Sequence, residues 1–448
     1  MSPEPSPEIE RTKQQFLFVV TGEYFVTGFF WVFSTLGSLL LSRGKGDPAQ
    51  MLFFSMFILM LSNGIWEVLT GWYADKFKRQ FSMSVGFLAC LVGFILMGLA
   101  VVPGVGTDPI FSSRSLVWNI GISIWSLGPA LLSGAQEAWL VDRCNFFSEA
   151  PPENVDDTFK KSAALGVIFK SLGTAICFLI FYWRVPHFSG EQDDAVVFLL
   201  PALLAAGLSA GLFFRSLRLR EEYWSHPKYQ TNESLLSFVW NAAKDLSGRQ
   251  FRWFTLGYVG VMSINYVLST TIWPYLASVR KDKPLLNWGV VLIAAELAGS
   301  VLSSPFSNLI DRIRQERARI PVASLMYVAP LLLVLLYGRN SPDALLYALI
   351  VTASMFRIAH ASVFGSLNTI GQLAIDSDER RALQLSMSSA ISSFVMSAVF
   401  FLSFRLTTHG AEEVYPPIKE FWSWVPVIFI SILVWGGYRA TRPRAEAS

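Results

Sequence analysis

Long apolar runs, separated by short polar segments, fill this chain from one end to the other. Each run reaches the roughly 20 residues that a helix needs to cross the hydrocarbon core of a bilayer. Runs of this length are too long for barrel strands, and backbone groups in lipid must satisfy their own hydrogen bonds, so we expect helices. The pattern predicts twelve of them, over residues 15–42, 49–70, 81–103, 115–141, 162–184, 194–215, 252–279, 287–309, 320–338, 342–372, 383–406 and 420–438.

The composition fits the same class of protein. Of the 448 residues, 52% are hydrophobic and only 15% are charged, whereas an ordinary soluble domain carries about a quarter charged residues. The net charge of +3 gives no reason to expect nucleic-acid binding. The three cysteines have no paired or metal-ligand spacing, so we expect buried thiols and no metal site. The sequence therefore predicts an all-α membrane protein.

The basic residues orient the helices in the membrane. If both termini lie in the cytoplasm, 24 of the 36 Lys and Arg residues fall in cytoplasmic loops, ten fall outside and two lie within helices. Cytoplasmic loops collect Lys and Arg. The first residues, Met1 to Arg11, lack the basic-then-apolar order of a cleaved signal peptide. We expect a monomeric multi-pass protein of the lipid bilayer, in a bacterial inner membrane, with both termini cytoplasmic.

The chain repeats itself after about half its length. The loop segment Gly71–Arg79 is matched by Ser307–Gln315, 236 residues later, and each follows a membrane-length apolar run. Matches at offsets of 235 or 236 also relate the first helix to the seventh and the fourth to the tenth. They pair Val32 to Thr35 with Val267 to Thr270, Gln136 with Gln372, and Asp142 with Asp378.

A constant offset of half the chain predicts two related halves. We place the N-terminal six-helix bundle in residues 1–215 and the C-terminal bundle in residues 252–448. The polar segment 216–251 joins them. Within it, the stretch from Ser234 to Lys244 has its apolar residues on one helical face, which predicts an amphipathic helix on the cytoplasmic membrane surface.

The repeated loop has a recognisable form. Gly71, Asp75, Lys76 and Arg79 resemble the G-x-x-x-D-(R/K)-x-G-(R/K) loop motif of the major facilitator superfamily, except that Lys78 replaces the usual glycine. The resemblance implies twelve transmembrane helices in two pseudo-symmetric six-helix bundles. It also implies a transporter with its substrate between the bundles and alternating access by rocking of the halves.

Two further patterns refine the resemblance. The segments Glu67–Gly71 and Ser133–Asp142 are similar to the E-x-x-T-G and S-G-x-x-E-A-x-x-x-D patterns of a poorly characterised, efflux-like bacterial branch of the superfamily. The family's antiporter motif in helix 5, G-x-x-x-G-P-x-x-G-G, is missing from Gly166–Gly173. The first observation favours export and the second favours uptake.

The resemblance also implies a charged gate that holds the halves together on the cytoplasmic side. The other interpretation is a simple anchor of positive charge on that side. The residues we assign to the gating motif are Glu67, Gly71, Asp75, Lys76, Arg79, Asp142, Asp311 and Arg312.

Charged residues inside the predicted helices are the main functional candidates. Such a residue at a helix centre costs roughly 2.5–3.5 kcal/mol on insertion scales, so each one needs an explanation. In the superfamily, helices 1, 4, 7 and 10 line the central cavity. On these helices we expect cavity positions at Glu23, Glu137, Asn265, Arg357 and His360.

Each candidate has more than one interpretation. Arg357 and His360 are one helical turn apart and can together hold a carboxylate or phosphate; alternatively, Arg357 forms a structural ion pair with Glu296. Glu23 has no obvious partner and is our candidate for proton coupling, because a carboxyl group in an apolar environment keeps its proton more readily. The alternative is a permanently neutral, hydrogen-bonded acid.

Glu137 and Lys170 lie on adjacent predicted helices and can form an internal pair. Aromatic residues such as Trp31 and Tyr266 lie on cavity helices and are candidates for contact with an apolar or aromatic ligand.

These features predict a secondary active transporter of a small organic solute, coupled to protons, with export slightly favoured over uptake. The mixed charges suit a zwitterion or an organic anion better than a purely cationic drug. A non-transporting receptor or lipid-handling protein on the same fold is the other hypothesis. We expect no enzyme activity and no cofactor, because the chain has no glycine-rich phosphate loop, nucleophile elbow or metal-ligand cluster.

Overall fold

The computed structural model of the chain is built from helices. It describes residues 7–41, 48–101, 112–147, 153–184, 194–219, 221, 234–246, 249–279, 285–313, 318–326, 350–351, 354–360, 362–367, 381–407, 425 and 428–439. The principal helices are α1 (Pro7–Leu41), α2 (Pro48–Lys76), α3 (Arg79–Ala100), α4 (Ser113–Leu132), α5 (Ala135–Phe147), α6 (Glu153–Arg184), α7 (Asp194–Ser216), α8 (Leu235–Leu246), α9 (Arg249–Val279), α10 (Leu285–Asp311) and α13 (Arg381–Thr407).

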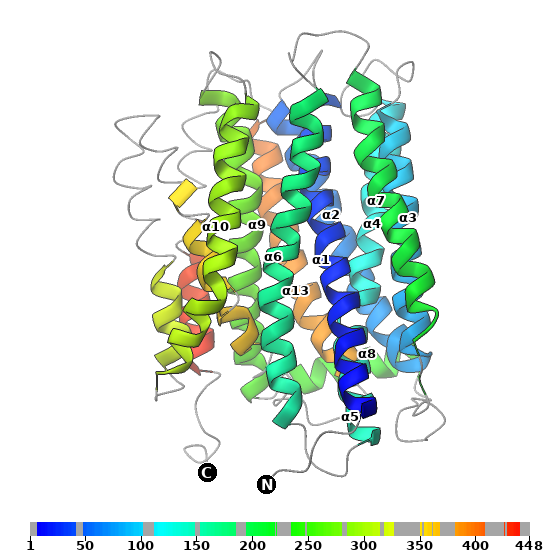
Figure 1. Cartoon of the computed structure of the whole chain (residues 1–448), viewed down its shortest axis with the longest axis vertical. Helices are drawn as coiled ribbons and strands as arrows, with labels where there is room; N and C mark the ends of the chain where they lie inside the picture. The colour runs from blue at the N-terminus through cyan, green and yellow to red at the C-terminus, as the bar shows by residue number, and fades with distance from the viewer. Residues whose placement is uncertain are drawn as a thin grey trace.

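Most of these helices stand side by side in one upright bundle, with α8 lying across one end of it (Figure 1). Within the described residues, eight helical spans are long and apolar enough to cross a membrane. The start of α1 and the described helix that ends at Arg439 lie toward the same end of the bundle (Figure 1). All twelve predicted segments coincide at least in part with described helix.

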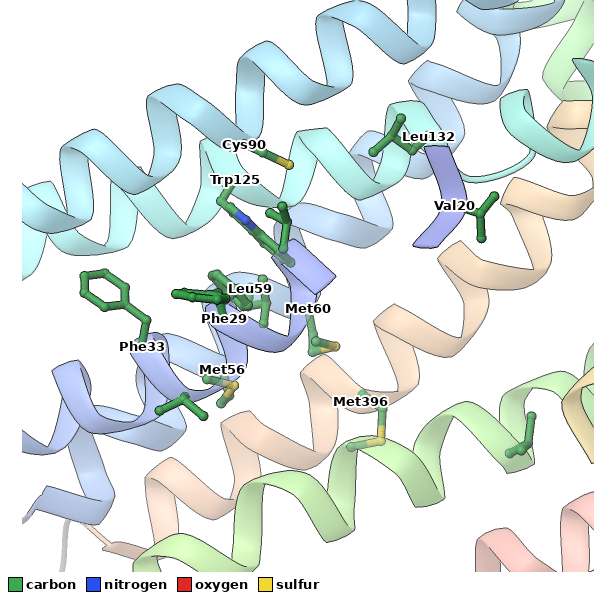
Figure 2. Packing of buried hydrophobic residues seen from close by; sticks show 14 of the residues in the cluster. Val20, Phe29, Phe33, Met56, Leu59, Met60, Cys90, Trp125, Leu132 and Met396 are labelled. Carbon is green, nitrogen blue, oxygen red and sulfur yellow. The ribbon is translucent and has the colours of Figure 1, made fainter. Parts of the chain in front are cut away.

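The outer surface of the bundle is apolar. Leu203, Phe214 and Val301 are each more than half exposed, which is the arrangement expected where lipid, rather than water, surrounds the helices. The interior is packed with large side chains. Figure 2 shows Phe29 and Phe33 of α1 among the packed residues, with Met56, Leu59 and Met60 of α2 and Trp125 of α4.

Among the described helices, two pairs make the most extensive contacts between the first half of the chain and the second. Along one pair, α2 packs against α13, with ring contacts at one end (Phe54 with Phe404 at 5.3 Å) and an amide–hydroxyl bond further along (Asn63 Nδ2 to Ser393 Oγ, 2.9 Å). Along the other, α6 packs against α10, where the Ser171 and Ser300 hydroxyls are 2.7 Å apart. Small polar groups and rings therefore dominate both contacts.

The fourth predicted helix is not continuous. The sequence predicts one helix over 115–141, but the structure has two segments, α4 and α5, separated at Ser133 and Gly134. Gly134 has a φ of 72°, a conformation that residues with a Cβ adopt only at a cost. Pro129 lies one turn earlier inside α4. The prediction of a single helix was wrong because the glycine reverses the local backbone.

The segment between the halves contains a helix, as expected. In α8, Leu236 is 83% exposed and Trp240, one turn later, is 75% exposed. These two side chains form an apolar edge on a helix that lies across the end of the bundle (Figure 1), which suits a position at the membrane surface. The boundaries at residues 215 and 252 remain predictions.

Candidate functional site

Three carboxyl groups approach one another deep in the bundle, and we call this group the acidic level. It consists of Glu23 on α1, Glu67 on α2 and Glu137 on α5. Among the described residues, the charged groups that act on Glu23 are the other two acids, and the Gln136 side chain lies against it. The acidic level therefore collects like charges without a base beside Glu23.

The break between α4 and α5 lies beside Glu67 of the acidic level. The Ser133 hydroxyl, at the break itself, donates to Glu67 Oε2 at 2.7 Å. The carbonyl groups that lose their helical partners at the end of α4 are also satisfied: Thr70 donates to Ala130 O at 2.8 Å and Ser82 donates to Leu131 O at 2.9 Å. Since a helix end leaves unpaired carbonyls, these hydroxyls stabilise the break.

The break also explains the two sequence patterns. Glu67 and Thr70 belong to the E-x-x-T-G segment, and Ser133 and Gly134 begin the S-G-x-x-E-A segment. The structure brings both segments together at one point. Glu137 lies in the first turn of α5. A helix N-terminus favours negative charge nearby.

Glu67 also connects the two halves of the chain. Its second carboxylate oxygen, Oε1, accepts a hydrogen bond of 2.7 Å from Ser389 on α13. Glu67 is 2% exposed. One buried carboxylate thus receives hydroxyl groups from both halves.

A second group, which we call the basic level, consists of Lys170 on α6, Glu296 on α10, and Arg357 and His360 in the described helix 354–360. Arg357 Nη2 lies 3.0 Å from Glu296 Oε2, and both side chains are largely buried. Lys170 is near enough to interact with both of them. Its Nζ lies 5.4 Å from the centre of the Trp31 ring.

Aromatic rings lie beside the basic level. The Trp31 ring on α1 and the Tyr266 ring on α9 have centres 5.6 Å apart. His360 stacks on Phe364 at 5.3 Å, and Phe364 in turn lies 5.9 Å from Tyr258. Rings from both halves therefore meet beside the basic level.

The repeat relates residues of α1 to residues of α9. Glu23 and Trp31 are eight positions apart on α1, and Tyr258 and Tyr266 are eight positions apart on α9. At 1.5 Å per residue the members of each pair are separated by about 12 Å along their helix. The pairs are related by the repeat offset of 235, because Glu23 matches Tyr258 and Trp31 matches Tyr266.

The structure shows where part of the predicted gating motif lies. Arg79 forms an ion pair with Asp142 of α5, and both are almost fully buried. This pair lies within the first half of the chain. Lys76 covers the Trp72 ring at 4.5 Å, Gly71 is buried in α2 and Arg312 is exposed. The side chains of Asp75 and Asp311 lie outside the described part of the structure.

The remaining predicted side chains are distributed as follows. Arg357 is paired with Glu296, which was the alternative interpretation of that arginine. Lys170 lies with this pair and with Trp31 rather than with Glu137. Asn265 is buried on α9, and its Oδ1 has no hydrogen-bond partner among the described residues.

The sequence analysis missed the helix break and the contribution of Ser389. Pro129 followed by Ser133 and Gly134 was an available signal for the break, since proline and glycine commonly end helices. Ser389 lies in a serine-rich stretch of α13 that carries no distinctive motif. Its pairing with Glu67 depends on contact between the halves, which no local pattern encodes.

Metal binding has little support in the described residues. They contain no group of three or more His, Cys, Asp or Glu side chains placed to hold a metal ion. The chemistry that this site offers is hydrogen bonding, charge pairing and contact with aromatic rings.

Comparison with solved structures gives full-length matches at low identity. A bacterial homologue of the iron transporter ferroportin, in an outward-facing state with soaked iron, matches with a TM-score of 0.65 and 13% identity, covering 96% of this chain and 99% of that one. The xylose transporter XylE from E. coli, in a partially occluded inward-open conformation, matches with a TM-score of 0.64 and 12% identity over 94% and 98%. The nucleoside transporter NupG matches with a TM-score of 0.59 and 15% identity over 96% and 98%.

The fucose transporter FucP, described as a major facilitator superfamily transporter in the outward conformation, matches over 94% of this chain with a TM-score of 0.59. This chain has the major facilitator fold. The predicted all-α membrane architecture is thereby confirmed. No family model and no curated protein sequence matches the chain, so the predicted efflux-like branch gains no support.

The acidic and basic levels have similar positions in this fold. Both lie where helices of the two halves face each other, since Glu67 meets α13 and Lys170 meets Glu296 and Arg357. In transporters of this architecture, substrate and coupling-ion sites lie near the bilayer midplane between the repeats.

Proposed function

We propose that this chain is a secondary active transporter that moves a small organic solute by alternating access and couples the movement to protons. The observation that carries the proposal is the pair of buried levels of opposite charge between the two halves. Ionisable residues inside a membrane domain are costly, and they mark solute and ion pathways. The chemistry of such a pathway needs no enzyme activity and no cofactor.

The acidic level supports the coupling to protons. Glu23 has two acids as its charged neighbours and Gln136 beside it, so a proton bound there removes like-charge repulsion. We assign the coupling role to Glu23. Glu67 is held by hydroxyl groups from both halves, and we assign it, with Arg79 and Asp142, to the gate.

The basic level supports a solute with a negative group. Glu23, Glu137, Asn265, Arg357 and His360 are the cavity residues we propose, and their mixed charges suit a zwitterion or an organic anion. The named substrates of the proteins with similar structures include a sugar, nucleosides and iron. Because one fold accommodates such different solutes, the fold itself does not identify the substrate.

The direction of transport is a separate question. Export is the direction we propose, from the resemblance of the Glu67–Gly71 and Ser133–Asp142 segments to the efflux-like branch. Uptake of an organic anion or zwitterion is the alternative, favoured by the basic level and by the missing motif in helix 5. We propose that the protein acts as a monomer in the inner membrane with both termini cytoplasmic.

The test uses purified protein in proteoliposomes loaded with a pH-sensitive dye. Anionic, cationic and zwitterionic solutes are added with and without an imposed pH gradient, and proton movement is followed with solute movement. We expect solute-dependent proton flux in the wild type and solute flux without pH dependence in Glu23→Gln. Unchanged pH dependence in that variant removes Glu23 from the coupling role. Binding without any flux supports the receptor hypothesis instead.

A further inference from the structure

Lys170 is a buried base that forms no ion pair within the described part of the chain. Its side chain is 8% exposed, and its Nζ lies 5.4 Å from the centre of the Trp31 ring. No hydrogen bond or ion pair joins Lys170 to another residue in the described part of the chain. An uncompensated buried charge is strongly unfavourable.

The acid nearest to Lys170 is already engaged. Glu296 lies 3.0 Å from Arg357, in an ion pair that is almost enclosed. The group formed by Lys170, Glu296 and Arg357 therefore contains two bases and one acid. When all three are charged, this group of described residues carries a net charge of +1, and Lys170 is the base that is outside the ion pair.

The protein backbone holds Lys170 at this position. A Cβ on Gly28 of α1 would collide with the carbonyl oxygen of Lys170, and a Cβ on Gly173 would collide with the carbonyl oxygen of Phe25. These glycines allow α1 and α6 to touch. On the other side, Ser171 bonds to Ser300 of α10 at 2.7 Å. Lys170 is thus fixed between the halves and cannot move away from the cluster without disturbing both contacts.

Two other buried groups on neighbouring helices lack partners. Asn265 Oδ1 and His360 Nδ1 have no hydrogen-bond partner among the described residues, and both side chains are more than nine-tenths buried. Buried polar atoms are nearly always paired. Asn265 directly precedes Tyr266, whose ring meets Trp31, and His360 is one turn from Arg357. His360 is near enough to Lys170 and Arg357 to interact with both charges, and Asn265 is on the helix that brings Tyr266 to Trp31.

We propose that Lys170 binds the carboxylate of the transported solute and that the solute is a small monocarboxylate with an apolar or aromatic body. The deficit of one negative charge fits a monoanion better than a dianionic phosphate ester. Trp31 and Tyr266 flank the body of the solute, and Asn265 and His360 bond to its polar groups. Arg357, which the sequence suggested as the anion site, instead holds Glu296 in place.

This inference refines the substrate class of the proposed transporter, but its test does not depend on transport. The thermal unfolding temperature of the purified full-length protein is measured in detergent with benzoate, benzylamine or benzyl alcohol at equal ionic strength. These three probes share one ring and differ in charge. A ligand that binds only the folded protein raises this temperature. We expect benzoate to raise it, and the cation and the alcohol to leave it unchanged.

Three variants test whether benzoate binds at Lys170. Lys170→Met should weaken benzoate binding by at least about tenfold while leaving the unliganded unfolding temperature equal to or above that of the wild type, because an unpaired buried base has been removed. Lys170→Arg keeps the charge and should retain part of the benzoate shift. Lys161→Met, an exposed lysine on the same helix, is the matched control and should behave as the wild type.

Three results overturn the proposal. The first is that benzoate does not raise the unfolding temperature of the wild type. The second is that benzoate raises the unfolding temperature of Lys170→Met as much as that of the wild type. The third is a clear fall of the unliganded unfolding temperature in Lys170→Met, which would make Lys170 a structural base. Failure of the transport proposal would look different. In that case benzoate would still bind in a way that requires Lys170, but no solute would move in proteoliposomes. The binding site would then stand, and only the transport function would be rejected.

Discussion

The acidic and basic levels differ in which parts of the chain contribute their buried charged groups. The three acids of the acidic level all lie in the first half of the chain, with Glu67 held by Ser133 at the helix break and reached from α13 by the hydroxyl groups of Ser389 and Ser386. The basic level is divided between the halves, since Lys170 is on α6 and its charged neighbours are on the other half. A rocking motion would therefore separate the charged groups of the basic level from one another, but would break only hydroxyl contacts of the acidic level.

This difference suggests a division of tasks. A group that stays intact during rocking can hold a proton through the whole cycle, whereas a group that is divided can bind a solute in one arrangement and release it in another. Substitutions in the two levels should then have different consequences, and the following experiments compare them.

The largest effect is expected at the acidic level. Glu23→Gln keeps the size of the side chain but cannot exchange a proton at neutral pH, so uphill transport driven by a pH gradient should be lost completely. Downhill exchange of solute should remain. Counterflow and gradient-driven flux in the same proteoliposomes separate the two. Loss of both activities to the same extent would contradict the division of tasks.

A large loss of stability is expected at the basic level. Arg357→Met leaves Glu296 as a buried acid without its ion pair, and removal of one partner from such a pair costs roughly 3–5 kcal/mol. Unfolding of the purified protein in detergent measures the change. The double variant Arg357→Met/Glu296→Gln should recover much of the loss. If the single variant is as stable as the wild type, Lys170 has replaced Arg357 as the partner of Glu296.

A smaller effect is expected at the helix break behind the acidic level. Gly134→Ala places a Cβ at a φ of 72°, which costs about 1–2 kcal/mol. Gly207→Ala on α7 is the matched control, because nothing lies within 4 Å of a Cβ there and the residue is helical. The control should be neutral or slightly stabilising. Equal unfolding temperatures for both variants would mean that the break contributes no conformational constraint.

The smallest effect is expected at the hydrogen bond between Ser389 of α13 and Glu67 of the acidic level. Ser389→Ala removes one hydroxyl from Glu67, and interhelical hydrogen bonds in membrane proteins average about 0.6 kcal/mol. A double-mutant cycle with Glu67→Gln isolates the interaction. A coupling energy near zero would show that this bond does not join the halves in the protein's resting state.

The sequence was sufficient for the architecture but only partly for the site. Three local or periodic features predicted the helices and the superfamily fold. They are the length of the apolar runs, the distribution of bases and the repeat offset. Lys170 illustrates the limit: adjacency of helices suggested Glu137 as its partner, whereas the packing of α6 against α10 places it beside Glu296 and Arg357. Such pairings are decided by side-chain directions across helices far apart in the chain.

The correspondence between α1 and α9 has a consequence for the history of the molecule. If the two halves descend from one duplicated segment, Glu23 and Tyr258 began as the same residue, as did Trp31 and Tyr266. One position has kept an aromatic ring in both copies, and the other has diverged into a carboxyl group and a phenol. Because the halves of this fold are parallel repeats related by an axis along the membrane normal, an ancestor assembled from two identical copies would have presented the same side chains from both halves around that axis. The divergence at the second position gives the present chain a different chemical group in each half.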